Sequence, residues 1–254
     1  MVAAEYQVRA ITGDQFIIIY TCGSATVKAW LARFLRMFNS STDEWVAGLD
    51  VEYTTVLGRE KDLKDEERKK PAVIQVCVHD LCLVYHICHA DVECQDFKNF
   101  LKDKRVKFVT VGFKNDSDVL RRIGLVVGQP FDLQKASLVS SSQPSMLTLA
   151  AAMIDPSYAK LKKPHHEFHH AWESKTLDED HILYAVMDAY LCLNIYKGLD
   201  EEAEPSVQFK QRSVGEEEEE EGRGRSRGRG LGLQVGGSAV AHAGSTAVSS
   251  GLVA

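Results

Sequence analysis

Two carboxylates interrupt an otherwise apolar strand, Val46-Ala47-Gly48-Leu49-Asp50-Val51-Glu52-Tyr53. Residues two apart on a strand project to the same face, so Asp50 and Glu52 point the same way. Ionised carboxylates are costly to remove from water, and two side by side repel each other unless a cation neutralises them. The pair therefore suggests a site for a hard metal ion with oxygen ligands. The alternative is an exposed edge strand with two solvated acids.

The residues on either side of this strand alternate between strand-like and helix-like patterns. Strands are expected at residues 6–12, 16–22, 46–53, 72–78, 82–86 and 106–111. The first two form a hairpin around Gly13-Asp14. Helices are expected at residues 25–38, 92–101, 116–123, 145–154 and 178–199, and a charged loop at residues 58–70. This interleaving predicts an α/β fold, with a sheet flanked by helices.

The chain has 254 residues, of which 44% are apolar, and this suits one ordinary domain with appendages. No stretch reaches the roughly 18 apolar residues of a membrane span, and no secretory signal is expected. The six cysteines show neither a CxxC nor a Cys/His ligand spacing. We therefore expect reduced structural thiols in an intracellular protein of the nucleus, the cytoplasm or both. They are Cys22, Cys77, Cys82, Cys88, Cys94 and Cys192.

The net charge of −6 is unevenly distributed. Residues 200–222 hold ten acids against two basic residues, and residues 223–254 hold four arginines and no acid, which leaves −2 for residues 1–199. The composition of residues 200–254, a Glu run followed by Gly/Arg-rich sequence, predicts a disordered tail. Such a tail can contact nucleic acid non-specifically, bind a protein partner, or only increase solubility.

Two further segments can supply oxygen ligands. Asp116 follows the expected strand 106–111, at a position where an acid also suits the first turn of a helix. Tyr184 and Asp188 are four residues apart on an expected helix and share its inner face, where a buried carboxylate needs a partner. The phenol can position a water beside a metal-bound carboxylate, although a core tyrosine with a bonded hydroxyl also fits this spacing.

Three sequence blocks resemble, in order, the three motifs of a known enzyme family. They are Leu49-Asp50-Val51-Glu52, Gly112-Phe113-Lys114-Asn115-Asp116 and Tyr184-Ala185-Val186-Met187-Asp188. They are similar to the motifs of DnaQ-like 3′–5′ exonucleases of the tyrosine (DEDDy) subtype, and more closely to the Werner syndrome-like exonuclease domain. The resemblance covers residues 45–198. Residues 6–38 resemble small plant members, including the RISC-interacting clearing exoribonuclease-like proteins.

The resemblance implies an RNase H-like mixed sheet, an exonuclease domain within residues 1–199, and two divalent ions. Asp50, Glu52 and Asp188 would ligate the catalytic ion, with Asp50 bridging to the second. Asp116 would reach the second ion through water, and Tyr184 would orient the attacking water. Mg²⁺ suits such oxygen ligands, and Mn²⁺ should substitute for it. The implied reaction releases 5′-mononucleotides from the 3′ ends of single-stranded RNA or DNA.

The chain departs from the family pattern at two positions. Tyr53 stands where many relatives have tryptophan, and Thr110 interrupts a usual Val-Gly-Val-Gly pattern; neither is expected to contact a proposed ligand. Residues 160–170 are also unusual because they contain four histidines. Four histidines could bind a metal, but we expect a solvated loop there instead. The lysines there are candidates for binding the nucleic-acid backbone. They are Lys160, Lys162 and Lys163.

Three functional hypotheses follow from the sequence. The first is a metal-dependent 3′–5′ exonuclease, which is favoured because the four acids and the tyrosine are all retained. The second is a catalytically silent relative that serves as a nucleic-acid or protein-binding module. The third makes the Gly/Arg tail the main functional element. The resemblance is also compatible with partners in RNA-processing or DNA-repair complexes and with a homo-oligomer.

Overall fold

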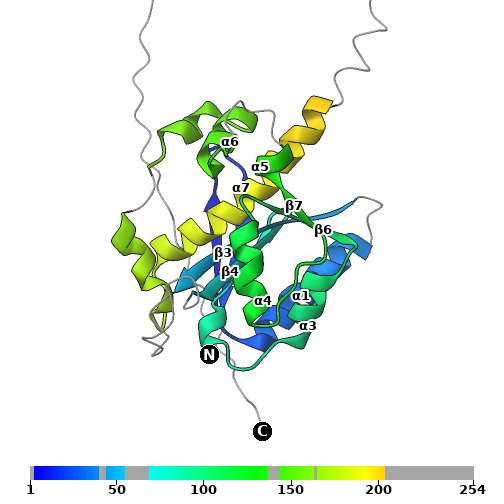
Figure 1. Cartoon of the computed structure of the whole chain (residues 1–254), viewed down its shortest axis with the longest axis vertical. Helices are drawn as coiled ribbons and strands as arrows, with labels where there is room; N and C mark the ends of the chain where they lie inside the picture. Colours follow the sequence, from blue (N-terminus) through cyan, green and yellow to red (C-terminus); the bar gives the residue numbers. More distant parts are fainter. Residues whose placement is uncertain (1–2, 40–43, 55–68, 137–142, 163–164, 204–254) are drawn as a thin grey trace, which may run out of the picture.

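The structure, a computed structural model, describes residues 3–39, 44–54, 69–136, 143–162 and 165–203 (Figure 1). The charged loop expected at residues 58–70 falls almost entirely outside these ranges, and the predicted disordered tail lies outside them from residue 204 onward. Among the described helices, none combines the length and the apolar character that crossing a membrane requires.

The centre of the fold is a seven-stranded mixed sheet. In the sheet the strands lie in the order β1-β2-β5-β4-β3-β6-β7. Neighbours β1/β2, β5/β4 and β4/β3 are antiparallel, whereas β2/β5, β3/β6 and β6/β7 are parallel. The strands are β1 Ala3–Arg9, β2 Gln15–Thr21, β3 Trp45–Thr54, β4 Lys70–Val78, β5 Leu81–Tyr85, β6 Val106–Thr110 and β7 Pro130–Asp132.

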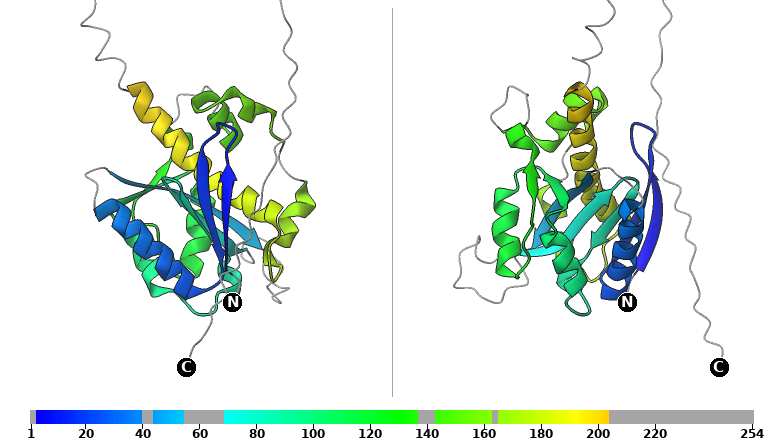
Figure 2. Two further views of the ribbon diagram at one scale, coloured as in Figure 1. Left: turned by 180° about the vertical axis from the view of Figure 1, so that it is seen from behind. Right: turned by 90° about the vertical axis from the view of Figure 1, so that its right-hand side faces the viewer.

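Helices cover both faces of this sheet, so the predicted α/β architecture is confirmed (Figures 1 and 2). One apolar cluster packs α1, α3 and α4 against one face. A second packs α6, η2, η3 and the long α7 against the other. The helices are α1 Ser24–Asn39, η1 Ile87–His89, α3 Gln95–Lys102, α4 Lys114–Arg122, α5 Leu133–Ala136, α6 Met146–Met153, η2 Pro156–Lys160, η3 His166–Glu173 and α7 Glu179–Ala203.

The sequence missed the short elements. It predicted neither β7 nor α5, and it assigned a loop to residues 160–170, where the structure has the 3₁₀ helix η3 instead. The three-residue β7 and the four-residue α5 are too short to show a hydrophobic period, and a 3₁₀ helix does not follow the 3.6-residue period of an α-helix. The long elements were predicted within a few residues, and α7 extends beyond Leu199 to Ala203.

One expectation about the cysteines is wrong. A disulfide joins Cys77 of β4 to Cys82 of β5. The two residues face each other in the antiparallel register, because the short turn between the strands brings them directly opposite. The prediction of six reduced thiols therefore fails for this pair. The other four cysteines take part in no disulfide: Cys22, Cys88, Cys94 and Cys192.

The packing of α7 on β3 depends on a glycine. A Cβ at Gly48 would overlap the carbonyl group of Ala189 and press on Leu193, because the helix backbone lies directly on the strand there. Cys192 lies over the same strand, with its thiol directed at the Leu49 carbonyl at 3.9 Å. Gly48 thus permits the close approach that brings the preceding turn of α7, which carries Asp188, over the end of β3.

Gly48→Ala should destabilise the protein by about 3 kcal/mol or more, because the added methyl group meets backbone that cannot rotate away. Urea unfolding measures the change. Ala25→Ser is the control, since Ala25 is exposed on α1 and a substitution at the surface changes stability little. An unfolding free energy for Gly48→Ala equal to that of the wild type would contradict the packing described here.

Candidate active site

Three carboxylates from two elements meet at one end of the sheet. Asp50 and Glu52 project from the face of β3 that α7 covers, and Asp188 projects toward them from α7. One oxygen from each lies within 4.8 Å of the others. All three side chains are partly buried, and only 12% of the Glu52 side chain is exposed. The alternative of an exposed edge strand is excluded, because β3 lies between β4 and β6.

Tyr184 stands one turn before Asp188 on α7, and its hydroxyl donates a hydrogen bond to that carboxylate. Burial and the negative charges of Asp188, Glu52 and Asp50 raise the pKa of the Tyr184 phenol well above its ordinary value. The hydroxyl is therefore protonated at neutral pH and remains a donor beside the three acids. Its ring packs against Phe168 and Trp172 of η3.

Asp116 approaches the cluster from the other side of the sheet. It lies in the first turn of α4, which follows β6 through Gly112 in the left-handed region at φ 73°. β3 and β6 are parallel neighbours, so residues at their carboxyl ends meet at the same edge. Only 9% of Asp116 is exposed, and its charge raises the pKa values of Asp50 and Glu52.

The expectation that Tyr53 contacts no proposed ligand is wrong. Its hydroxyl donates a hydrogen bond to Oδ1 of Asp116. A side chain that follows Glu52 on the strand points to the opposite face, and α4 lies on that face. Thr110 is buried and directs its hydroxyl at the Phe131 carbonyl at 3.4 Å, away from the acids. The bond from Tyr53 could not be read from the sequence, because it depends on where α4 begins.

The clustered acids raise one another's pKa values in the ion-free protein. For Asp50, burial is the largest cause, followed by the charges of Asp188, Glu52 and Asp116. For Glu52, burial is again first, followed by Asp188 and Asp116. Burial and the nearby Asp132 raise the pKa of Asp116 to about 6, against the lowering effect of its bond from Tyr53. The site thus concentrates negative charge. No lysine or arginine contributes to the pKa shifts of these three acids.

This donor set fits hard divalent cations. All the converging ligand atoms are carboxylate oxygens, which Mg²⁺ and Mn²⁺ prefer. A cation between them would offset both the burial cost and the mutual repulsion. Asp50, Glu52 and Asp188 are close enough to share one ion. Asp116 is not part of this group of three, although its charge acts on Asp50 and Glu52.

His169 also lies at the site, and the sequence reasoning did not select it. Its Nδ1 is 3.9 Å from Oε2 of Glu52, and its ring meets that of Tyr184 edge to face at 5.6 Å. The four histidines drew attention as a group, but no sequence pattern showed which of them a 3₁₀ helix would direct inward. Within the described residues, His169 does not belong to either cluster of three side chains whose ligand atoms lie close enough together to hold a metal ion.

The basic residues proposed for the nucleic-acid backbone lie at and after η2. Lys160 and Lys162 are exposed, and Lys163 falls outside the described residues. Their role in binding stays a prediction.

Comparison with solved structures identifies the class of fold. The chain resembles the exonuclease domain of Nibbler from Aedes aegypti with a TM-score of 0.54 and 14% identity, covering 76% of this chain and 89% of that one. At such low identity the likeness concerns the fold alone, and it confirms the predicted RNase H-like architecture.

The family itself follows from sequence. A 3′–5′ exonuclease family model matches residues 59–204, more than half of the chain, and the chain therefore belongs to this family. It is 27% identical over 180 residues to exonuclease 3′-5′ domain-containing protein 2 of Drosophila melanogaster. It is 30% identical over 163 residues to the mouse bifunctional 3′-5′ exonuclease/ATP-dependent helicase WRN. These matches cover 66% and 62% of this chain, but only 28% and 11% of the two relatives.

Asp116→Asn should stabilise the ion-free protein at pH 7 by roughly 2–3 kcal/mol, given about 1.4 kcal/mol per unit of pKa difference. At pH 4 the carboxyl is protonated in the folded chain and about half ionised in the unfolded chain, so the advantage of the variant should then be only a small part of its value at pH 7. As pH rises from about 4 to about 6, the unfolded chain loses this proton first and the wild type loses stability.

Urea unfolding in a chelator at pH 4 and pH 7 measures this difference. The control is Asp118→Asn, an exposed acid two residues along the same helix. If the unfolding free energy of Asp116→Asn does not exceed that of the wild type at pH 7, or exceeds it by as much at pH 4, then burial and neighbouring negative charge do not raise the pKa of Asp116.

Proposed function

We propose that this protein is a two-metal-ion-dependent 3′–5′ exonuclease that removes 5′-mononucleotides from the 3′ ends of single-stranded RNA or DNA. The observation that carries the proposal is the convergence of Asp50, Glu52 and Asp188 at one end of the sheet. Asp116 and Tyr184 adjoin them, and membership of the 3′–5′ exonuclease family supports the reaction class. The second hypothesis, a catalytically silent binding module, finds no missing acid to support it.

The roles proposed for the acids are those that the resemblance to the exonuclease motifs implies. Asp50, Glu52 and Asp188 would hold one divalent ion, and Asp50 together with Asp116 would hold the second. When bound, the ions supply positive charge beside the scissile phosphate and favour the deprotonated form of an attacking water. Magnesium is the proposed ion, and manganese should substitute because it accepts the same oxygen ligands.

Tyr184 and Tyr53 act through their hydroxyl groups. Tyr184, held one turn from Asp188, can bind the attacking water and fix its direction of approach. Tyr53 holds Asp116 by a hydrogen bond, so its departure from the usual tryptophan supplies a contact to a proposed ligand. The phosphodiester bond breaks at its 3′-oxygen, and the terminal nucleotide leaves with the 5′-phosphate.

The other sequence-based predictions concern the surroundings of the enzyme. Lys160, Lys162 and Lys163 are proposed to bind the substrate backbone. An intracellular location in the nucleus or cytoplasm, protein partners in RNA processing or DNA repair, and a homo-oligomer stay predictions. Deletion of residues 204–254 separates the third hypothesis from the first, because a tail-dependent function would be lost and exonuclease activity would remain.

Asp50→Asn and Asp188→Asn should each reduce activity roughly 1000-fold or more, since about 4 kcal/mol of transition-state stabilisation by the ions corresponds to three powers of ten. The measurement is Mg²⁺-dependent shortening of 5′-labelled, matched single-stranded RNA and DNA and of a 3′-recessed duplex. Asp118→Asn serves as the active control. A wild type that binds these substrates but shortens none with Mg²⁺ or Mn²⁺ would support the silent binding module instead.

Tyr184→Phe should lower kcat by about 10- to 100-fold, the effect of losing one hydrogen bond of about 1–3 kcal/mol to the reacting water. KM should change little, because the ring remains. Tyr190→Phe is the matched control, since Tyr190 lies on the same helix and its hydroxyl is directed at Asp14 instead. If the two variants have the same kcat, Tyr184 does not orient the water.

A further inference from the structure

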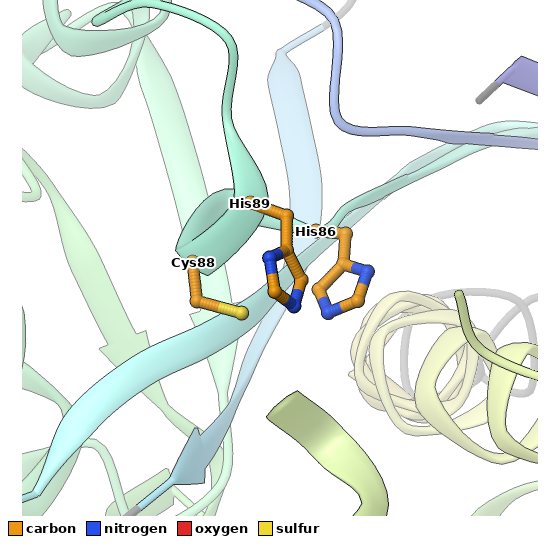
Figure 3. Close-up of side chains that lie close together, drawn as sticks. All are labelled: His86, Cys88 and His89. Atoms are coloured by element: carbon orange, nitrogen blue, oxygen red, sulfur yellow. The ribbon is translucent and has the colours of Figure 1, made fainter. Parts of the chain in front are cut away.

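A second cluster of ligand-type side chains lies where β5 passes into η1. His86, Cys88 and His89 point toward one another (Figure 3), with one candidate ligand atom of each within 4.8 Å of the others. His86 is fully buried, and the other two are partly buried. The carboxylate site does not include these residues, and no motif in the sequence drew attention to them.

The hydrogen bonds of His86 show which of its ring nitrogens carries the proton. Its Nε2 lies 2.9 Å from the Trp172 carbonyl, which can only accept, so Nε2 carries the proton and donates. Its Nδ1 lies 2.9 Å from the Tyr20 hydroxyl and, carrying no proton, accepts a hydrogen bond from it. Tyr20 in turn accepts a bond from the Leu177 backbone N–H at 3.1 Å. Burial lowers the pKa of His86 to about 4, which agrees with a neutral ring.

These bonds favour a structural clamp over a metal site. Both ring nitrogens of His86 are already bonded within the protein, and a metal would have to displace one of them from a buried partner. Cys88 directs its thiol at the same Trp172 carbonyl at 3.8 Å. Burial raises the pKa of that thiol to about 12, whereas a metal needs the thiolate. His89 completes the arrangement, with Nε2 donating to the Glu173 carbonyl at 2.8 Å.

The two carbonyl groups belong to the C-terminal end of η3, and η3 borders the carboxylates. The Glu173 side chain accepts a bond from Thr54 of β3 at 2.9 Å. Trp172 is fully buried and lies against the ring of Tyr184 at 6.1 Å between centroids. One turn earlier, His169 lies 3.9 Å from Glu52. Contacts that hold the C-terminal end of η3 in place therefore also hold the residues of η3 that border the carboxylate site.

We propose that His86 and His89 are positioning residues of the exonuclease site, which bind the Trp172 and Glu173 carbonyl groups and so hold η3 beside Glu52 and Tyr184. This inference rests on the proposed function. η3 is a 3₁₀ helix of eight residues, and such helices have weaker hydrogen bonds than α-helices. His86, between β5 and η1, and His89 of η1 supply the bonds that its last carbonyl groups lack, and thereby keep Tyr184 in one orientation.

The test compares His89→Leu, which removes the donor to Glu173, with His89→Gln, which keeps a donor at a similar distance along the side chain. His89→Leu should lower kcat about tenfold through the loss of one buried hydrogen bond. It should also accelerate amide hydrogen exchange in residues 165–177. His89→Gln should restore both to near the wild-type values. His86→Gln, which keeps the Nε2 donor, should retain more activity than His86→Leu.

Phe97→Leu is the control for a general loss of stability, because Phe97 is buried on the opposite face of the sheet. It should lower the thermal midpoint while leaving kcat and the exchange of residues 165–177 unchanged. The proposal is overturned if His89→Leu matches the wild type in both readouts, or if Phe97→Leu reproduces its effects. Zinc purified with the wild type in a one-to-one ratio and lost in His89→Leu would also overturn it, in favour of a metal site.

The exchange measurement keeps the two proposals separate. If the wild type shortens no nucleic acid, the proposed function fails whatever the His89 variants do. In that case, unchanged exchange in His89→Leu would additionally show that His89 does not hold η3. Faster exchange would show that the clamp exists without the catalytic role assigned to it.

Discussion

The close contact between α7 and β3 is the constraint on which the rest of the structure depends. The helix backbone lies on the strand at Gly48, where no side chain larger than hydrogen fits. This contact brings Asp188 to Asp50 and Glu52, and it places Tyr184 one turn earlier on the same helix. A larger residue at position 48 would lift the helix and separate the acids.

That contact creates an electrostatic cost which a cation can remove. Burial and mutual repulsion raise the pKa values of Asp50 and Glu52 in the ion-free protein, and Asp116 adds to the same field. Such a cluster does not favour folding, because apolar side chains at the same positions would lower the free energy of the folded protein more than buried carboxylates do. The arrangement would become favourable with the proposed divalent ions bound, so on this proposal stability in this region is given up for ion binding.

Much of this could be predicted from the sequence. The period-two placement of Asp50 and Glu52, and the four-residue spacing of Tyr184 and Asp188, fix which side chains share a face. The long strands and helices follow from hydrophobic periodicity. What the sequence did not provide depends on contacts between distant segments. The bond from Tyr53 requires the position of α4, and the place of His169 requires a 3₁₀ helix with little periodic signal.

The central claim is that the four acids form one binding site for two ions. Crystals soaked with Mn²⁺ and a 5′-mononucleotide test it most directly, because anomalous scattering locates manganese independently of any assumption about the site. The account predicts two peaks, one bounded by oxygens of Asp50, Glu52 and Asp188, and one between Asp50 and Asp116. No peak at these carboxylates, or manganese bound only at His86 and His89, would contradict it.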